Sequence, residues 1–363
     1  MKLPLSLLLF FCLACSPLRQ LHKVQSDKRL RKTETLNFTG EKAMTQWWYY
    51  DCVLEDGSVL VFLFTPYQWW DKKEKMPTYK SLFYFSYMYP DGRVVSEQKI
   101  FDAAQVQYND DRIKAPCFEI VRMHDLKARN YTVSFYLDSI QGSVKINSDG
   151  KAFSPFPRGS MSSTVTSLFK RKVKGLAYRY AAHMPQGKVV CDLKLQDKKI
   201  DLSGKAYHEQ GWFTGSPDRM GDGWTWFHFV SDNINVLGTP GQFFCFENTG
   251  KRLVGGLEKN CCLTEMVYAE EPSGFLTRGK LSFHSRKLSF EISPTGKASV
   301  PLICLPSDET DQLWGTVCQP SFITLSYKGK ESREKGVLFL ETCRMKKKKS
   351  ENITVISGDG PKQ

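Results

Sequence analysis

The 363-residue chain lacks the features that define several common protein classes. No long stretch has an apolar period of 3.6 residues, which disfavours helical bundles and parallel α/β folds. No apolar run reaches the roughly 18 to 20 residues that a helix needs to cross a bilayer. After residue 15 there is no Cys-x-x-Cys pair and no Cys/His cluster with zinc spacing, so we expect no metal and no other cofactor.

The sequence also lacks a basic stripe interleaved with aromatic residues, although its formal net charge is +13. The positive charge gathers at the two ends: six basic residues against Asp27 in 19–32, and five more in 344–349. The region between them is near neutral, which argues against nucleic-acid binding. Two basic ends predict either attraction to anionic lipid headgroups or simply solvated, flexible ends.

The first 15 residues have the features of an export signal. Lys2 precedes an almost unbroken apolar run over 3–13. The run ends in Cys-Leu-Ala-Cys at 12–15, which is similar to a lipoprotein signal whose last cysteine, Cys15, is acylated. An ordinary cleaved signal and an uncleaved anchor are the alternatives. All three predict export, and acylation predicts a protein tethered to a bacterial cell envelope on its periplasmic or outer-surface side.

Cysteine is abundant, with 11 residues. The nine that follow the signal segment cannot all pair within one chain, because their number is odd. Several lie inside apolar runs, where a buried free thiol is the usual state. We predict one disulfide, between Cys304 and Cys318.

Short runs with period-two alternation fill residues 36–343, separated by turn signals. Four hairpins are predicted in the first half: 47–54 with 59–65, 79–89 with 93–100, 131–137 with 143–146, and 176–181 with 188–195. Shorter strands follow in the second half, at 224–230, 242–246, 280–283, 288–292, 322–327 and 337–340. Closing a sheet into a barrel removes its edge strands, and about eight strands enclose one small ligand.

These patterns predict an all-β protein of two antiparallel β-barrel lobes in tandem. The predicted organisation is a signal segment, a basic linker, two lobes and a basic tail: 1–15, 16–35, 36–200, 201–343 and 344–363. A Ser-, Pro- and Gly-rich stretch at 151–170 is interpreted as an irregular loop or lid within the first lobe.

The first notable motif is Gln-Trp-Trp-Tyr-Tyr-Asp at 46–51. In a strand, Trp48 and Tyr50 face one side, and the alternate residues face the other. A strand with aromatic residues on both faces needs cover on both, which a barrel wall packed against a second lobe provides. One face is predicted to line an apolar ligand cavity; the alternative is two ordinary cores that meet at this strand.

The second motif is Gly-Lys-Ala-Tyr-His-Glu-Gln-Gly-Trp at 204–212. Its polar residues stand between bulky apolar ones, so burial requires full hydrogen bonding. Among aromatic rings the pKa of the Glu209 carboxyl is expected to rise, which suits a general acid near neutral pH. His208 and His228 are candidates to orient this acid or to share its proton. The alternative is a polar network that braces a strand crossing.

At these segments the sequence resembles the carotenoid 1,2-hydratase (hydroxyneurosporene synthase) family of tandem lipocalin-like proteins, which includes exported lipoproteins encoded with transport systems. Relatives carry Glu-Trp-Trp-Tyr before an Asp-Gly hairpin, where this chain has Gln-Trp-Trp-Tyr at 46–49. They also carry Gly-x-Gly-Tyr-His-Asp-His-Asn-Trp, where 204–212 retains the first Gly, Tyr-His and Trp but has Glu-Gln-Gly in place of Asp-His-Asn. A Gly-Trp-x-Trp-Phe stretch at 223–227 matches as well.

The resemblance implies two lipocalin-like barrels and an apolar partner, such as a lipid or an isoprenoid. In the hydratases of the family the acid of the motif protonates a carbon–carbon double bond, and water adds to the cation. Carried over, Glu209 is the proton donor, with His208 and Tyr207 beside it in the catalytic group. Tyr207, Trp212, Trp224 and Trp226 are implied to line the site and to stabilise the cation through their ring faces. The residues predicted to bind the ligand are Trp48, Tyr50, Trp212, Trp224, Trp226 and His228.

Three functional hypotheses follow. The first is a membrane-tethered carrier that binds an apolar molecule and passes it to a transport system. The second is a hydratase or isomerase of a carotenoid or terpenoid, with Glu209 as the acid. The third is a structural or interaction protein with filled barrels. The departures from the family motif fall on its polar residues while its aromatic residues persist, which favours binding over catalysis.

Overall fold

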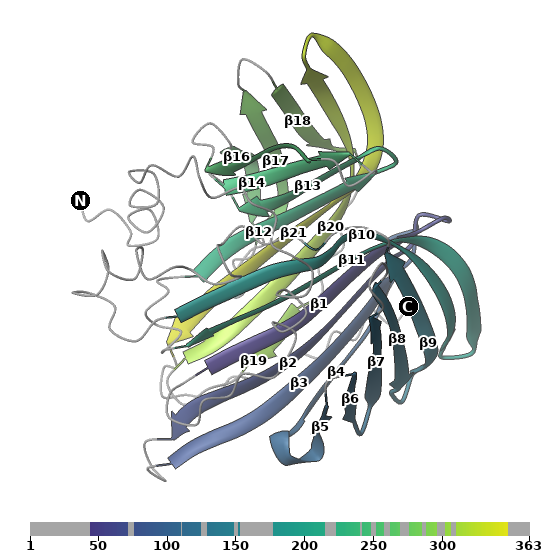
Figure 1. Ribbon diagram of the computed structural model, residues 1–363, viewed down its shortest axis with the longest axis vertical. Coiled ribbons are helices and arrows are strands. Elements are labelled where there is room, and N and C mark those ends of the chain that lie inside the picture. Colours follow the sequence, from purple (N-terminus) through teal and green to yellow (C-terminus); the bar gives the residue numbers. More distant parts are fainter. Residues whose placement is uncertain are drawn as a thin grey trace, which may run out of the picture.

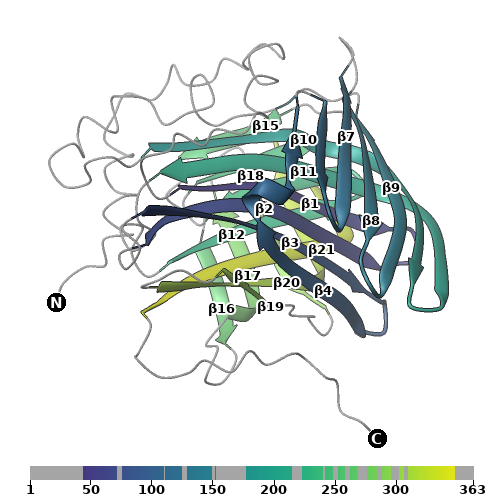
Figure 2. The same cartoon turned by 90° about the horizontal axis from the view of Figure 1, so that it is seen from below.

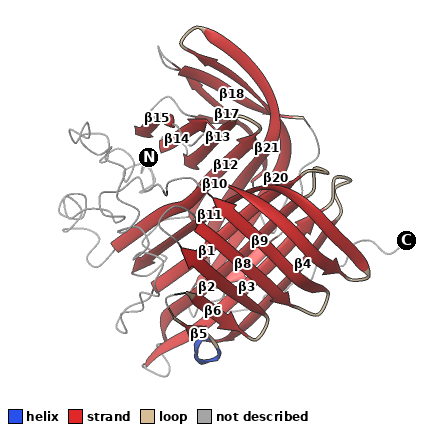
Figure 3. Cartoon of the chain, turned by 45° about the vertical axis from the view of Figure 1, so that its right-hand side comes forward, coloured by secondary structure: helices blue, strands red, loops and turns tan. Residues whose placement is uncertain are grey.

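The computed structural model describes residues 44–71, 76–109, 111–124, 129–148, 152, 177–214, 223–239, 242–247, 252–257, 262–268, 276–284, 288–295, 302–305 and 310–347. Nearly all of them are in β-strands, and a short 3-10 turn at Ala103–Gln105 follows β4 (Figure 3). The strands form two curled antiparallel sheets (Figure 1). The predicted all-β class with two lobes in tandem is confirmed.

The first sheet has the strand order β4-β3-β2-β1-β11-β10-β9-β8-β7-β6-β5. Its strands are β1 Met44–Leu54, β2 Val59–Asp71, β3 Met76–Met88, β4 Val94–Asp102, β5 Gln107–Tyr108, β6 Arg112–Ala115, β7 Phe118–His124, β8 Arg129–Tyr136, β9 Ile140–Ser148, β10 Ala177–Leu195 and β11 Lys198–Thr214.

The second sheet has the order β15-β14-β13-β12-β21-β20-β18-β17-β16, with β19 also paired to β20. Its strands are β12 Gly223–Ser231, β13 Ile234–Thr239, β14 Gln242–Glu247, β15 Arg252–Leu257, β16 Cys262–Tyr268, β17 Leu276–His284, β18 Leu288–Pro294, β19 Leu302–Leu305, β20 Thr310–Tyr327 and β21 Lys330–Lys347.

The two sheets share one connectivity. In each, the first strand pairs with the last, β1 with β11 and β12 with β21. In each, the two strands at the ends of the order are consecutive in the sequence, β4 and β5 or β15 and β16. Each lobe is therefore an up-and-down meander that curls until its first and last strands meet.

Three of the predicted hairpins are confirmed, and glycine-containing turns close two of them. Gly57 and Gly92 have φ angles of 86° and 88°, a left-handed conformation that glycine adopts without a steric penalty. In the first of these turns Asp56 accepts a hydrogen bond from the Ser58 backbone N–H at 2.8 Å. The predicted pairings of β1 with β2, β3 with β4 and β8 with β9 are all present.

The fourth predicted hairpin is wrong. Ala177–Leu195 is one continuous strand, and Pro-Gln-Gly at 185–187 lies inside it. The pairing of β10 with β11 is irregular between Ala182 and Gly187. Such a β-bulge accommodates proline and glycine within a strand, so these residues mark a distortion of the ladder and not a reversal of the chain.

The predicted Cys304–Cys318 disulfide is also wrong. Cys304 lies opposite Leu313, which is five residues from Cys318 along β20. At about 3.3 Å per residue, this separation exceeds the reach of a disulfide. In the part of the chain that the structure describes, the buried free thiols are Cys52, Cys117, Cys191 and Cys318.

Three large apolar cores lie among the described residues, besides a small contact of Ala152 with Ala181. The first lies inside the first sheet and includes Trp48 and Tyr50. The third lies inside the second sheet and includes Phe227. The second core joins the lobes, because it contains Tyr49 of β1 together with Trp226 of β12. In Figures 1 and 2, β12 and β21 run beside β1 and β11. The motif strand is thus covered on both faces, as its sequence requires.

Several predicted segments lie outside the described residues. They are the signal segment with Cys15, the linker 16–35 and, apart from Ala152, the loop 151–170. The chain leaves the first sheet after Thr214 and enters the second at Gly223, whereas the lobe boundary expected from the sequence is near residue 200. The predicted basic tail from 344 begins inside β21. Within the part that the structure describes, no helix has the length and apolar character to cross a bilayer.

Candidate active site between the lobes

The pairing of β1 with β11 brings the two sequence motifs together. Tyr49 lies opposite Glu209, and Asp51 lies opposite Tyr207. Because side chains alternate along a strand, these four residues share the face that meets the second lobe. On the same face of β11, the position after Glu209 is Gly211, which has no side chain. The motifs therefore meet at the boundary between the lobes.

Glu209 is buried and accepts hydrogen bonds on both carboxyl oxygens. Its Oε1 accepts from the indole Nε1 of Trp47 at 3.1 Å. Its Oε2 accepts from the hydroxyl of Tyr207 at 2.6 Å, and that hydroxyl lies 2.7 Å from the hydroxyl of Tyr180 on β10. The carboxyl is thus held in a fixed orientation by aromatic donors from three neighbouring strands.

Burial raises the pKa of Glu209 from the ordinary value of 4.5 to about 7. Desolvation disfavours the anion, and the negative charge of Asp51 adds to this effect. The hydrogen bonds from Tyr207, Tyr180 and Trp47 act in the opposite direction and keep the rise from being larger. A carboxyl with a pKa near neutrality holds a proton in a substantial fraction of molecules and can donate it. The expected rise in the pKa of Glu209 is therefore present.

A second polar pair lies on the same face. The Nδ1 atom of His228, on β12, is 2.9 Å and 3.0 Å from the two carboxylate oxygens of Asp51. Both side chains are 1% exposed. The imidazole also packs on the Tyr207 ring, with centroids 4.4 Å apart, and on Phe339 of β21 at 5.6 Å. This pair connects the two lobes through a buried, charge-assisted contact.

Trp226 forms the aromatic wall of this region. Its ring centre is 5.5 Å from that of Tyr49 in an edge-on arrangement, 5.7 Å from Tyr207 and 6.0 Å from His228. The Nε1 atom of Trp226 and the Nε2 atom of His228 are buried without a hydrogen-bond partner among the described residues. The interface therefore presents both polar atoms and ring faces next to the acid.

The structure does not bring His208 to Glu209. Alternation along β11 turns its ring into the first lobe, where it stacks on Tyr50 at 4.0 Å and contacts Tyr131 edge-on at 4.8 Å. Its Nδ1 lies 3.0 Å from the backbone oxygen of Tyr49. In this geometry the histidine that can act near the acid is His228, and His208 belongs to the interior of the first lobe.

The residues predicted to contact a ligand divide between the two faces. Trp48 and Tyr50 pack inside the first lobe, against Phe64 at 5.4 Å and Phe62 at 4.5 Å respectively. Trp212 lies an even number of residues after His208 on β11, so it is on the same interior face, and it is half-buried. Trp226 and His228 lie at the interface, as described. Trp224 lies in β12 opposite Cys343, and its side chain is outside the described part of the molecule.

Sequence reasoning missed two of the acid's partners. Tyr180 falls in a predicted strand but has no motif around it, and Trp47 was recognised only as an aromatic residue. The sequence predicted the correct face for Asp51 but not its partner, His228. The alternation of the two motifs gives the face of each residue, but only the register of β1, β10 and β11 shows which side chains meet.

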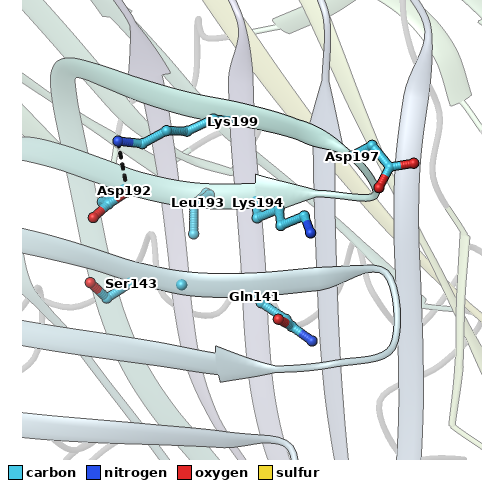
Figure 4. A pocket seen from close by; sticks show the side chains of 8 residues that line it. Gln141, Ser143, Asp192, Leu193, Lys194, Asp197 and Lys199 are labelled. Atoms are coloured by element: carbon cyan, nitrogen blue, oxygen red, sulfur yellow. Dashed lines mark ion pairs between the residues drawn. The ribbon is translucent and has the colours of Figure 1, made fainter.

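A surface depression of about 440 Å³ lies elsewhere, at the far ends of β9, β10 and β11 (Figure 4). It is lined by charged residues, including Lys199, whose Nζ is 3.9 Å from Asp192. Lys199 precedes Glu209 by ten residues on β11, roughly 30 Å of strand. This depression is not part of the interface. Among the described residues, no group of three or more His, Cys, Asp or Glu side chains has a metal-binding arrangement.

The comparison with protein families gives a match over more than half of the chain. The model of the Diels-Alderase-like family matches residues 16–230, which include β1, β11 and nearly all of β12. The chain belongs to the Diels-Alderase-like family. The matched segment contains Glu209, Asp51 and His228, so the interface described here lies largely within the family's shared region. A search of curated protein sequences found no match.

Several solved structures are similar in fold to this Diels-Alderase-like chain. An AttH-type protein from Nitrosomonas europaea has a TM-score of 0.53 at 13% identity, covering 85% of this chain and 96% of that one. CghA has a TM-score of 0.53 at 12% identity, covering 84% and 88%. Kievitone hydratase from Nectria haematococca has a TM-score of 0.51 at 10% identity, covering 85% and 93%.

These likenesses establish the fold. The two curled sheets of this Diels-Alderase-like protein are lipocalin-like lobes, as in the three solved structures. The resemblance to the carotenoid hydratase-like tandem lipocalin proteins is confirmed at the level of family and fold. At identities of 10 to 13%, the activities of those proteins do not transfer by themselves.

Proposed function

We propose that this protein binds an apolar isoprenoid-like or lipid molecule between its two lobes, and that Glu209 donates a proton to a carbon–carbon double bond of that molecule. The observation that carries the proposal is a buried carboxyl whose pKa is about 7, fixed by aromatic donors where the lobes meet. A structural brace needs its hydrogen bonds satisfied, but it does not need an acid poised near neutral pH.

The surroundings of the acid suit a cationic intermediate. Protonation of an alkene leaves positive charge on the neighbouring carbon, and ring faces attract such a charge. The rings of Trp226, Tyr49 and Tyr207 stand together on the face that carries Glu209. A desolvated site also strengthens the interaction of these groups with the developing charge.

The names of related proteins support the same class of reaction. A hydratase adds water across a double bond, and a Diels-Alderase joins a diene to an alkene, so both act on carbon–carbon double bonds. Against this background, the Glu-for-Asp difference in the motif lengthens the acid by one methylene. In this chain the longer side chain still receives hydrogen bonds on both oxygens.

The test is deuterium transfer from solvent. Purified full-length protein is incubated in D₂O with squalene or geranylgeraniol in detergent micelles, and mass spectrometry measures deuterium in the recovered probe. We expect incorporation at alkene carbons with the wild-type protein and none with Glu209→Gln. Glu291→Gln changes an exposed glutamate on β18 and serves as the matched control. Equal incorporation by wild type and Glu209→Gln, or none by either, contradicts the catalytic role.

A carrier without turnover is the second candidate, favoured by the apolar character of the aromatic wall around Trp226. Native mass spectrometry with organic extraction, on protein from its own host, tests it. A stoichiometric apolar molecule retained by both wild type and Glu209→Gln, without deuterium transfer to it, identifies a carrier that passes its ligand to a partner such as a transport system. Extraction of no apolar molecule from repeated preparations counts against both readings.

We also propose that export and acylation at Cys15 hold the body at the membrane where apolar molecules are found. This rests on the sequence of residues 1–15 alone. Growth with an alkyne-tagged fatty acid labels a lipoprotein, and Cys15→Ser removes the label. A tag that persists in Cys15→Ser, or a wild-type protein that is never labelled, contradicts acylation at this residue.

A further inference from the structure

The Asp51–His228 pair has a defined tautomer. A carboxylate only accepts hydrogen bonds, so the imidazole Nδ1, at 2.9 Å and 3.0 Å from its oxygens, is the donor. The opposite nitrogen, Nε2, is buried and has no hydrogen-bond partner among the described residues. A proton on Nε2 leaves a buried N–H without an acceptor, which is unfavourable. Nε2 is therefore the ring nitrogen that is left to accept a hydrogen bond or a proton from a bound group.

This base lies close to the acid. The ring of Tyr207 packs against His228 with centroids 4.4 Å apart, and the hydroxyl of the same Tyr207 donates to Glu209 at 2.6 Å. One side chain thus separates a proton donor from a proton acceptor. The two groups reach the interface from different lobes, Glu209 on β11 and His228 on β12.

The remaining contacts of His228 fix its ring and leave Nε2 as the polar atom without a partner. Phe339 stacks on the ring, with an interplanar angle of 16°. Trp226 lies beside it, with ring centres 6.0 Å apart, and its Nε1–H is also buried without a partner among the described residues. The two buried atoms without a partner are thus a donor and an acceptor on neighbouring rings, the two kinds of group to which a water molecule or hydroxyl group can hydrogen-bond.

We propose that His228, oriented by Asp51, is the general base of this site and activates the water that adds to the protonated substrate. The proposal rests on the proposed function and extends it from a proton donor to a donor and acceptor pair. It assigns hydration, and not protonation alone, to the interface. Asp51 is a positioning residue, because it acts through the imidazole.

The carboxyl proton of Glu209 moves to one alkene carbon, and the π electrons form the new C–H bond. The other carbon becomes a cation, and a lone pair of water forms the C–O bond. His228 Nε2 accepts the proton that this oxygen loses. The imidazolium then returns a proton to the Glu209 carboxylate by way of solvent, so the net change is addition of one water molecule.

The experiment separates protonation from hydration. Full-length protein is incubated with squalene or geranylgeraniol in D₂O, and mass spectrometry measures both deuterated alkene and hydrated product. We expect His228→Gln to lower the hydration rate by about 10²- to 10⁴-fold, a usual effect of a general base. Deuterated alkene continues to form, because the Glu209 carboxylate can take a proton back from the cation. His284→Gln changes an exposed histidine on β17 and keeps the wild-type rates.

The outcomes distinguish the two proposals. If wild type forms neither product, the proposed function fails and the base role fails with it. If wild type forms both and His228→Gln hydrates at the wild-type rate, only the base role is overturned. If His228→Gln loses both products while its thermal unfolding is unchanged, His228 does not act on water alone and the proposal is again overturned.

Asp51→Asn tests the positioning role without removing the contact. An asparagine amide can donate to Nδ1, which moves the imidazole proton to Nε2 and removes the free base. We expect nitrogen NMR of histidine-labelled protein to show this tautomer change, with kcat reduced about 10²-fold or more and KM unchanged. A tautomer change with unaltered kcat, or a reduced kcat with the original tautomer, overturns the role assigned to Asp51.

Discussion

The two faces of the β1–β11 ladder differ in kind, although they belong to the same strands. The interior face carries Trp48, Tyr50 and His208, whose rings stack into an apolar core. The interface face carries Asp51 and Glu209, each in specific contact with polar groups of neighbouring strands. Adjacent residues therefore have different surroundings: one set packs inside the first lobe, and the other fixes the buried carboxyl of Glu209 where the lobes meet.

This difference predicts which property a substitution on each face will change. A change on the interior face removes packing, because its side chains are surrounded by rings of the same lobe. A change on the interface face alters protonation equilibria, because its groups titrate or hydrogen-bond to a group that does. Neighbouring positions of one strand can thus be used to test folding and chemistry separately.

The largest effect on stability is expected at Trp48. Trp48→Ala removes a fully buried indole that packs on Phe64 and Tyr108. We expect the free energy of unfolding to fall by about 3 to 5 kcal/mol, measured by urea denaturation. Trp47→Ala on the other face is the matched variant: its indole is only half-buried, so the loss of stability should be smaller. Similar losses for both variants would break the distinction between the faces.

The next effect is expected at the buried pair. Asp51→Ala leaves the Nδ1 of His228 buried without its acceptor, so stability should fall by about 3 kcal/mol. Asp51→Asn retains a hydrogen-bonding group and should lose less. The two variants are compared by thermal and urea unfolding at one pH. If Asp51→Ala is as stable as the wild type, the pair does not hold the lobes together.

The raised pKa of Glu209 predicts that the free energy of unfolding depends on pH, with an effect of similar size. Its pKa in the folded state is about 7, against an ordinary value of 4.5, so the folded state binds more protons between these pH values. Stability therefore decreases as pH rises from about 4.5 to 7, by roughly 3 kcal/mol, and is flat above that window. The measurement is the unfolding free energy of the wild type relative to Glu209→Gln across this range. A difference that stays constant with pH contradicts the raised pKa.

Much of the fold followed from the sequence because alternation and turn chemistry are local. The all-β class, the tandem lobes and three hairpins depend on residues close together in the chain. The prediction of a turn at 185–187 failed for a physical reason. A bulge and a turn both use proline and glycine, and only the pairing with β11 distinguishes them. The Cys304–Cys318 prediction failed because it needed the register of β19 on β20.

The candidate site was predictable only in part. The aromatic setting of Glu209 and its raised pKa were expected from the motif itself. Its partners come from β1 and β10, and the partner of Asp51 comes from the other lobe, on β12. The Trp47–Glu209 and Asp51–His228 contacts join residues more than 100 positions apart. They depend on how the meander closes and how the lobes pack, and no local pattern encodes them. His208 was grouped with Glu209 because it is adjacent in sequence, but adjacency in a strand means opposite faces.

The smallest effect, and the sharpest test of the interface, compares two buried tyrosines. Tyr207→Phe removes a hydrogen bond that lowers the pKa of Glu209, so that pKa should rise further, by about one unit or less, as expected for a bond worth roughly 1 kcal/mol. The Tyr49 hydroxyl has no hydrogen-bond partner among the described residues, so Tyr49→Phe should leave the pKa of Glu209 unchanged. Carbon NMR of glutamate-labelled protein measures both, with Glu209→Gln assigning the signal. Because the two rings lie 6.4 Å apart on the same face, equal shifts in both variants would show that ring packing controls the acid, whereas a shift in Tyr207→Phe alone attributes the control to its hydroxyl.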